Sequence, residues 1–214
     1  MNGAEDDEIG FEELYSEAGG QLDAVPWASL APNPALVSWL EDRPVTGSGV
    51  ALVIGCGYGD DAEELRRHGW EVAAFDIAPT AIARCRERFP NSTVEYRVAD
   101  LFALPARWHG GFDLVVENRT LQSLPLAQRP AAVSAIARTV RTGGTLWLRC
   151  LARADGEPLG RRPWPVSRDD LHGFLRAGFR EREFLEVALP AGAGRVFTVT
   201  YSAPPPDVGA SGSS

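Results

Sequence analysis

Short apolar runs alternate with amphipathic stretches over most of the chain. The run Gly49–Gly55 is almost continuously apolar, which is typical of a parallel strand covered on both faces. Asp60–His68 predicts a helix, because acidic residues fill its first turn, basic residues fill its last turn and Gly69 ends it. A further apolar run, Glu71–Asp76, predicts the next strand. The pattern therefore indicates a strand–helix–strand unit.

The same alternation continues to residue 151. Pro79 suits the first turn of a helix in which Ile82, Cys85 and Phe89 recur at helical spacing. A helix is predicted at Arg129–Arg141, where Gly143 and Gly144 would stop it. Three more strands are predicted at Val94–Val98, Phe112–Glu117 and Thr145–Leu151. Strands that alternate with helices favour a parallel sheet with helices on both faces.

The order of elements changes towards the end of the chain. A predicted helix, Arg168–Ala177, leads to two strands, Arg180–Leu189 and Arg195–Ser202, which the glycine-rich turn Pro190–Gly194 joins. Strands so close in sequence form a hairpin more easily than a crossover. We therefore expect an α/β fold, a Rossmann-like three-layer α/β/α sandwich whose mostly parallel seven-stranded sheet ends in an antiparallel hairpin.

The length of 214 residues favours one domain, which we place at residues 11–202 with an N-terminal cap segment at residues 11–48. Residues 1–10 are acidic, and residues 203–214 are rich in Pro, Gly and Ser without periodic apolar positions. Both ends are expected to be disordered, since neither can offset its ordering entropy by burial.

The net charge and the cysteine positions limit the classes of binding partner that we expect for this chain. A formal net charge of −8 and a pI near 5.0 disfavour nucleic acid and anionic membranes, which bind broad cationic surfaces. The cysteines, Cys56, Cys85 and Cys150, lie in or beside apolar runs, not at the spacing of a disulfide framework or a metal knuckle. With an acidic N-terminus and no apolar run of about 18 residues, we expect a cytoplasmic protein, monomeric or weakly homo-oligomeric, with no bound metal.

A glycine-rich turn directly follows the first strand. Gly55, Gly57 and Gly59 have the spacing GxGxG, which lets the backbone turn sharply and approach a ligand at the carboxyl edge of the sheet. Where a dinucleotide-binding motif has its last glycine, this chain has Asp60. A carboxylate at a helix N-terminus repels a pyrophosphate but tolerates a cationic ligand. The turn therefore favours S-adenosylmethionine over NAD.

Two further carboxylates end predicted strands. Asp76 lies 21 residues after Gly55, the usual separation for a carboxylate that accepts hydrogen bonds from ribose hydroxyls, although it could instead cap the following helix. Asp100, followed by Leu101 and Phe102, could hold an adenine amino group while its neighbours flank the ring, or serve only as a turn residue.

Polar residues also follow the fourth strand. Glu117, Asn118, Arg119 and Thr120 come at the edge where ligands bind in open α/β sheets. They would line the cleft, or else cap the next helix.

These segments resemble the successive motifs of class I S-adenosylmethionine-dependent methyltransferases. The resemblance covers about residues 49–151 and rests on Val53–Asp61, Phe75–Ile82, Val98–Leu101, Phe112–Glu117 and Gly143–Leu146. It implies S-adenosyl-L-methionine as cofactor, held by Trp27, Gly55, Cys56, Gly57, Gly59, Asp61, Asp76, Ile77, Asp100, Leu101, Glu117 and Asn118.

Three shorter segments, Val25–Pro34, Thr120–Pro125 and Pro163–Ser167, are similar to the branch that holds thiopurine, thiol and halide methyltransferases and their bacterial relatives. In that branch a tryptophan matching Trp27 packs against the methionine moiety of the cofactor, where cation–π attraction is reasonable; packing in the core is the alternative. The acceptor pocket is expected to include Tyr15, Thr120, Gln122 and Trp164, of which Trp164 could also be a hydrophobic plug beneath its loop.

Methyl transfer to a small molecule is the expected activity. The reaction mainly requires alignment of the nucleophile and exclusion of water. Among the three histidines only His109 falls in a loop that could face the cleft, and none has the context of a catalytic base. A thiol acceptor needs no strong base, so sulfur is favoured, with O- or N-methylation as the alternative and the catalytic residues left open. Methylation of a protein, an NAD-dependent oxidoreductase and an inactive cofactor-binding module also remain open.

Overall fold

The structure, a computed structural model, describes residues 10–19, 21–22, 25, 29–43, 49–159 and 162–205. A single sheet of seven strands has the order β3-β2-β1-β4-β5-β7-β6. The strands are β1 (Val50–Ile54), β2 (Glu71–Asp76), β3 (Glu95–Val98), β4 (Phe112–Asn118), β5 (Val140–Ala152), β6 (Arg180–Ala188) and β7 (Arg195–Ser202). The first five strands are parallel, and β7 runs antiparallel to both β5 and β6. The expected fold class is therefore confirmed.

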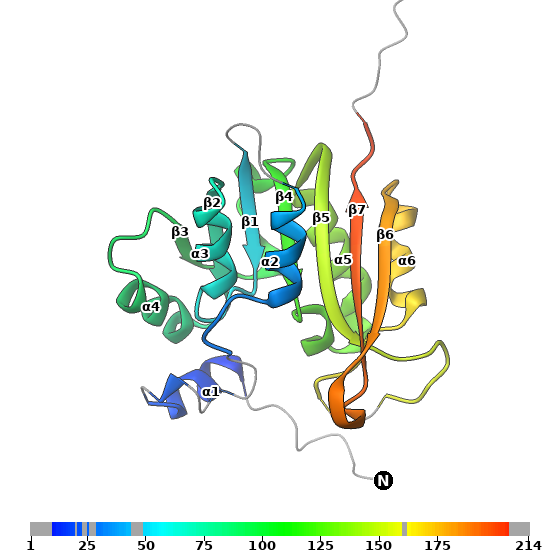
Figure 1. Ribbon diagram of the computed structural model, residues 1–214, viewed down its shortest axis with the longest axis horizontal. Helices are drawn as coiled ribbons and strands as arrows, with labels where there is room; N and C mark the ends of the chain where they lie inside the picture. The colour runs from blue at the N-terminus through cyan, green and yellow to red at the C-terminus, as the bar shows by residue number, and fades with distance from the viewer. Residues whose placement is uncertain are drawn as a thin grey trace, which may run out of the picture.

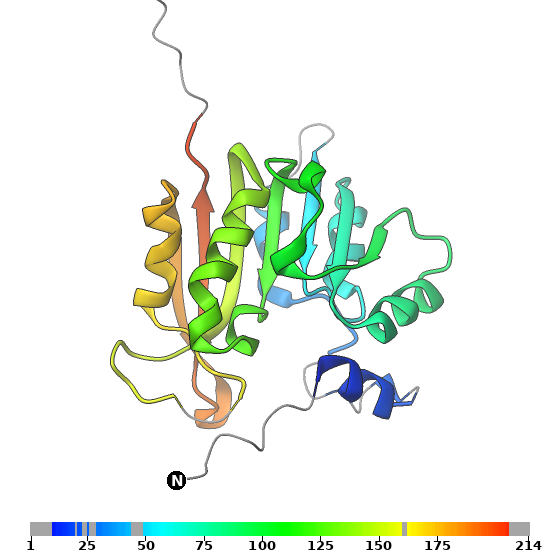
Figure 2. The same ribbon diagram turned by 180° about the vertical axis from the view of Figure 1, so that it is seen from behind.

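Helices cover both faces of the sheet (Figures 1 and 2). On one face, α2 (Pro34–Glu41), α3 (Asp60–Arg67) and α4 (Pro79–Arg88) share a buried apolar cluster with Val53, Ala74 and Trp147. On the other face, α5 (Arg129–Thr139) and α6 (Arg168–Arg176) pack on a larger cluster that includes Leu52, Val115 and Leu148. Burial of both faces explains why the central strands read as continuous apolar runs.

Residues Gly143 and Gly144 lie within β5, although the sequence pattern predicted that they would stop a helix. The helix α5 ends at Thr139, and Val140 already has extended backbone and pairs with Phe112. The register between β4 and β5 then shifts, which makes a bulge. At Gly144 a Cβ would lie 2.8 Å from the Arg141 carbonyl oxygen, so only glycine fits this bulge.

Pairing also continues past Ser202, the expected end of the domain. The Ala203 amide donates to the Gly144 carbonyl at 2.8 Å, and the Ala203 side chain is buried. The ordered strand region therefore extends beyond the predicted boundary. Residues 206–214 and residues 1–9, for which disorder was predicted, lie outside the described residues.

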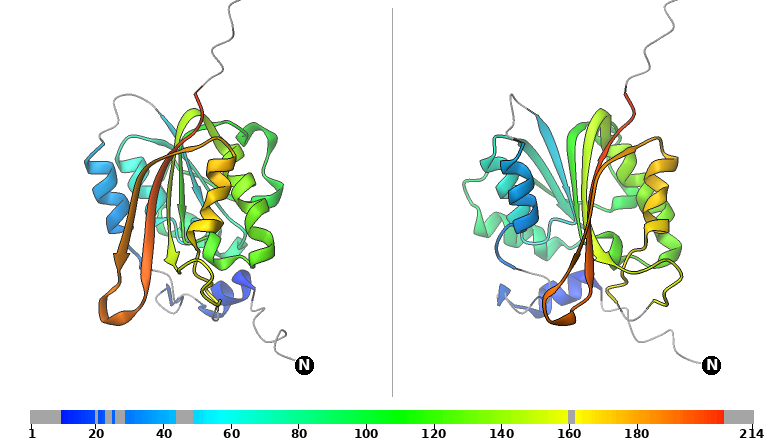
Figure 3. Two further views of the ribbon diagram at one scale, coloured as in Figure 1. Left: turned by 90° about the vertical axis from the view of Figure 1, so that its right-hand side faces the viewer. Right: turned by 45° about the vertical axis from the view of Figure 1, so that its right-hand side comes forward.

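A short N-terminal helix, α1 (Phe11–Glu17), lies at the carboxyl edge of the parallel strands (Figure 1). The Tyr15 and Tyr58 rings pack edge to face with centroids 5.2 Å apart, and the Thr80 amide donates to Glu12 at 3.0 Å. The tip of the β6–β7 hairpin reaches the same edge (Figure 3). At the carboxyl edge, α1 thus lies beside the ends of β1 and β2, and the hairpin tip lies beside the end of β5.

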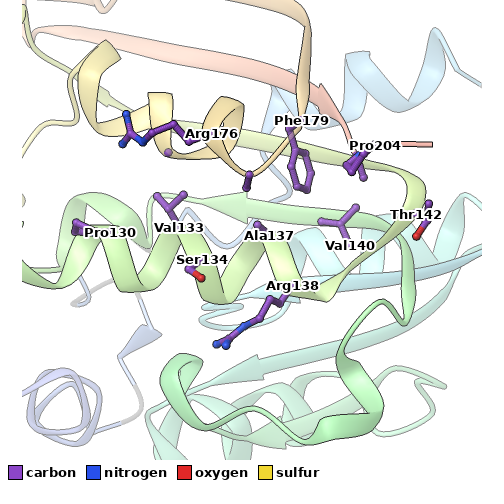
Figure 4. Close-up of a pocket in the computed structure, with 13 residues that line it drawn as sticks. Pro130, Val133, Ser134, Ala137, Arg138, Val140, Thr142, Arg176, Phe179 and Pro204 are labelled. Atoms are coloured by element: carbon purple, nitrogen blue, oxygen red, sulfur yellow. The ribbon is translucent and has the colours of Figure 1, made fainter. Parts of the chain in front are cut away.

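A groove of about 480 Å³ lies elsewhere, between α5 and α6 (Figure 4). Apolar side chains such as Val133, Ala137 and Phe179 line much of it. None of its lining residues belongs to the predicted site, whose residues lie at the carboxyl edge of the sheet.

Candidate functional site

The glycine turn after β1 has the conformation that its sequence predicts. Gly55, Gly57 and Gly59 have φ of +59°, +52° and +89°, a region that side-chain-bearing residues rarely adopt. A Cβ at Gly55 would collide with the Thr120 hydroxyl, which donates to the Ile54 carbonyl at 3.2 Å. Thr120, a predicted acceptor-pocket residue, therefore packs against this turn from the loop after β4.

Asp76 lies directly behind the turn. Its carboxylate accepts hydrogen bonds from the Gly57 amide at 2.9 Å and from the Ala78 amide at 3.0 Å, one on each oxygen. The side chain is 6% exposed, and burial raises its pKa. A carboxylate can accept about four hydrogen bonds in all, so these backbone bonds do not use its whole acceptor capacity. Asp76 can therefore still accept a hydrogen bond from a ligand hydroxyl.

A more open apolar region adjoins Asp76. The Ala99 amide donates to the Asp76 carbonyl at 3.0 Å, which places the end of β3 beside the end of β2. Ile77, Val98 and Phe102 are 54%, 50% and 41% exposed here, unusual values for large apolar side chains.

Asp100 lies within this region, while its neighbour Leu101 belongs to the core and is 7% exposed. One Asp100 oxygen accepts from the Phe102 amide at 2.9 Å, and the other has no partner among the described residues. A flat ring with an amino group matches this combination of a free carboxylate oxygen and exposed apolar side chains.

Asp61 and Asn118 bind each other rather than standing free. The Asn118 amide nitrogen donates to Asp61 at 2.8 Å, and the Asn33 backbone amide donates to the other Asp61 oxygen at 2.7 Å. Asn33 in turn donates to Asn118 at 3.3 Å, which closes a network of three side chains. The network ties the start of α2 to α3 and to the end of β4, next to the glycine turn. Sequence reasoning missed Asn33, although Asn-Pro is a typical helix start.

Glu117 is buried inside the protein and is not exposed at the carboxyl edge. It is 0% exposed, and one oxygen accepts from the Thr120 amide at 2.5 Å and the Leu121 amide at 3.0 Å. The other oxygen is buried without a partner. Burial raises the pKa of Glu117 to about 7. Its role here is to hold the loop after β4, so the cofactor contact predicted from the resemblance has no support in this geometry.

Gln122 is likewise buried beneath the predicted acceptor pocket. It is 4% exposed; its side chain accepts from the Leu151 amide at 2.6 Å, and its carbonyl accepts from the Trp164 amide at 2.7 Å. Gln122 thus holds the half-buried Trp164 near β5. Tyr15 is 4% exposed against the glycine turn. Trp27 lies outside the described residues.

The structure corrects two details of the sequence reasoning. His109 is exposed and precedes β4, so it lies at the amino edge of the sheet, opposite the candidate site. Asp60 does not present an unbalanced negative charge, because Arg88 binds both of its oxygens at 2.7 and 2.9 Å. Asp60 therefore repels a pyrophosphate at this helix less than the sequence suggested.

Cys85 is a further neighbour of the turn that the sequence did not predict, and its thiol donates to the Gly57 carbonyl at 3.1 Å.

Within the described residues, no three side chains of His, Cys, Asp or Glu gather as a metal site would require. In the same part of the chain, no helix has the length and apolar run of a membrane span.

Part of the chain is similar in sequence to known proteins. Residues 51–144 match the family model of the methyltransferase domain. The ubiquinone biosynthesis O-methyltransferase of Xanthomonas campestris is 33% identical over 125 residues, which cover 58% of this chain and 52% of that protein. The match thus spans about half the length of the curated relatives. The family match over residues 51–144 agrees with the predicted methyltransferase class and its S-adenosylmethionine cofactor.

Solved structures share the fold. The N-methyltransferase NodS from Bradyrhizobium japonicum, in complex with S-adenosyl-L-homocysteine, has a TM-score of 0.69 at 19% identity, covering 89% of this chain and 99% of that one. The 1,6-didemethyltoxoflavin-N1-methyltransferase of Burkholderia thailandensis has a TM-score of 0.68 at 19% identity, with 89% and 87% covered. At such identity, these likenesses concern the fold alone.

The buried Glu117 predicts a pH-dependent stability difference. Between its ordinary pKa of 4.5 and its folded pKa of about 7, the folded state binds more protons than the unfolded state, so the group destabilises the protein as pH rises through this window. Glu117→Gln removes that dependence and should gain stability relative to wild type as pH rises from 4.5 to 7, by at most about 3 kcal/mol.

Urea unfolding from pH 5 to pH 8 measures the difference. Glu41→Gln, at an exposed position of α2, is the matched control and should show no such trend. A Glu117→Gln difference that stays constant over this range would contradict the buried, protonated carboxyl.

Proposed function

We propose that this chain, whose residues 51–144 match the methyltransferase domain, is an S-adenosylmethionine-dependent enzyme that methylates a small-molecule acceptor. The observation that carries the proposal is Asp76, a buried carboxylate that the Gly57 amide orients beside a turn of three positive-φ glycines. The exposed apolar region around Asp100 supports it independently.

Three neighbouring groups of residues would bind the three parts of the cofactor. Asp76 would accept hydrogen bonds from the ribose hydroxyls, and Asp100 from the adenine amino group, with Ile77 and Phe102 against the ring. The amino-acid end would lie along the turn Gly55–Gly57, near the network of Asp61 and Asn118. When bound, the cofactor supplies a methyl group activated by a sulfonium.

The protein then has to align the acceptor and exclude water. Tyr15 and Tyr58 cover the turn from the side of α1. Among the described side chains at this edge there is no histidine, and Glu117 is buried behind the loop. We therefore place a thiol first among acceptors, since it is partly ionised near neutral pH without a strong base. Oxygen is the second candidate, because the curated relative is named as an O-methyltransferase.

Substitution of Asp76 tests the cofactor site. Asp76→Asn keeps the size of the side chain but removes the charge and one acceptor oxygen, so the affinity for S-adenosylhomocysteine should fall about 10- to 100-fold, as expected for hydrogen bonds to a charged group. Titration calorimetry measures this effect, with denaturant unfolding to confirm the fold. Asp169→Asn, exposed on α6, is the control and should bind as wild type does. Absence of binding by the wild-type chain would refute the proposed function.

An acceptor panel with radiolabelled cofactor tests the preference for sulfur. Matched thiol, hydroxyl and amine compounds of one carbon skeleton should give the highest kcat/KM for the thiol, and the rate should rise with pH through the pKa of the thiol itself. A higher kcat/KM for the hydroxyl compound, with a pH profile that does not follow the acceptor, would instead indicate an O-methyltransferase with its own base.

A further inference from the structure

Two arginines lie together where β4 and β5 reach the carboxyl edge. Arg149 is in β5, and its register partner in β4 is Asn118. The next residue, Arg119, donates its backbone amide to the Arg149 carbonyl at 2.8 Å. This backbone contact keeps the two residues adjacent across the sheet.

The Arg149 side chain is half-buried and only partly satisfied. It donates to the Thr198 hydroxyl of β7, while its Nε is buried without a hydrogen-bond partner. Burial lowers the pKa of Arg149, and the nearby positive charge of Arg119 lowers it further. A guanidinium thus loses solvent next to a second cation, which is unfavourable unless an anion is also present.

Among the described residues, neither arginine forms an ion pair with a carboxylate, whereas most of the other arginines do. Acidic groups are not scarce, since the chain has 29 of them against 21 basic ones. Burial raises the pKa of Asp61, and the charge of Arg119 opposes part of that rise. Both Asp61 oxygens already accept hydrogen bonds, from Asn33 and Asn118. Asp61 is therefore already engaged, and it forms no ion pair with Arg119.

The backbone of Arg119 also has an unusual conformation. Its φ of +71° lies in the left-handed region, which residues with side chains seldom adopt. The Arg149 carbonyl and the loop contacts of Glu117 maintain it. The fold therefore keeps Arg119 beside Arg149 in spite of local strain and like-charge repulsion.

Exposed apolar side chains continue from the arginines along the same face of the sheet. Thr198 is opposite Arg149 in β5 and opposite Leu185 in β6, and directly opposite residues of antiparallel strands share a face. Leu185 and Val187 are 49% and 47% exposed. In Figure 1 the helices α5 and α6 lie behind this part of the sheet, on the other face.

We propose that Arg119 and Arg149 bind an oxyanion of the methyl acceptor, a carboxylate or a phosphate, whose apolar part contacts Leu185 and Val187. The inference rests on the proposed function, because it names the acceptor class of the same site. The cofactor is another source of a carboxylate, through its methionine moiety. However, Arg149 lies two strands away from the glycine turn of β1, about 10 Å at the usual strand spacing, on the side opposite Asp76. This placement favours the acceptor.

Matched probes test the oxyanion. 4-Phenylbutyrate and phenyl phosphate should bind the full chain at least tenfold more tightly than the neutral 4-phenylbutyramide, measured by calorimetry with and without S-adenosylhomocysteine. In Arg119→Gln and Arg149→Gln this preference should disappear, while Arg149→Lys should retain part of it. Arg138→Gln, an exposed arginine of α5 with no ion pair among the described residues, should behave as wild type. Arg119 is exposed, so its variant remains informative if Arg149→Gln fails to fold.

Three results would overturn the inference, and each differs from a failure of the proposed function. Equal affinity for the butyrate and the butyramide would exclude an oxyanion site. Arginine variants that keep the preference would place the anion elsewhere. Variants that lose affinity for S-adenosylhomocysteine but not for 5′-methylthioadenosine, which lacks the carboxylate, would assign the pair to the cofactor. Failure of the proposed function would appear separately, as wild-type protein that does not bind S-adenosylhomocysteine.

Discussion

The candidate site depends on one hydrogen bond, which the Gly57 amide donates to the Asp76 carboxylate. This bond joins the glycine turn after β1 to the end of β2. It fixes a buried carboxylate at the end of β2 against the turn that follows β1. Parallel pairing brings these strand ends to one edge, and positive φ at the glycines lets the turn fold back over the carboxylate. Together with the Ala78 amide, the Gly57 amide offsets the cost of desolvating the Asp76 carboxylate. The site is therefore stabilised by the same backbone groups that shape it.

On the other side of the turn, the loops after β1 and β4 are linked by side chains. The Asn33–Asp61–Asn118 network ties three elements together, and Glu117 binds the amides of the loop from below. These contacts leave Arg119 and Arg149 as adjacent charges at the edge, beyond the region where the nucleoside is proposed to bind. The sheet edge is thus divided: carboxylates at β2 and β3 suit hydroxyl and amino groups, and guanidinium groups at β4 and β5 suit an anion.

Most of the fold and part of the site could be predicted from the sequence, for physical reasons. Continuous apolar runs, helix ends and the glycine spacing are local signals, and they located the strands, the turn and Asp76. The orientation of polar residues after β4 was not predictable, because it depends on the backbone of Arg119 and on tertiary contacts. Glu117 and Gln122 therefore turned out to be buried supports, and Arg88 neutralises Asp60 from a distant helix. Arg149 interrupts an apolar strand, a signal that was visible in the sequence but whose partner across the sheet was not.

The central claim is that the Gly55–Gly59 turn and Asp76 together hold the nucleoside of S-adenosylmethionine. A crystal structure of the full chain with S-adenosylhomocysteine tests it most directly. The account predicts the ribose hydroxyls within hydrogen-bond distance of the Asp76 carboxylate, the adenine between Ile77 and Phe102, and the amino-acid end along the glycine turn. A nucleoside bound elsewhere, or an Asp76 carboxylate with no contact to the sugar, would contradict the account.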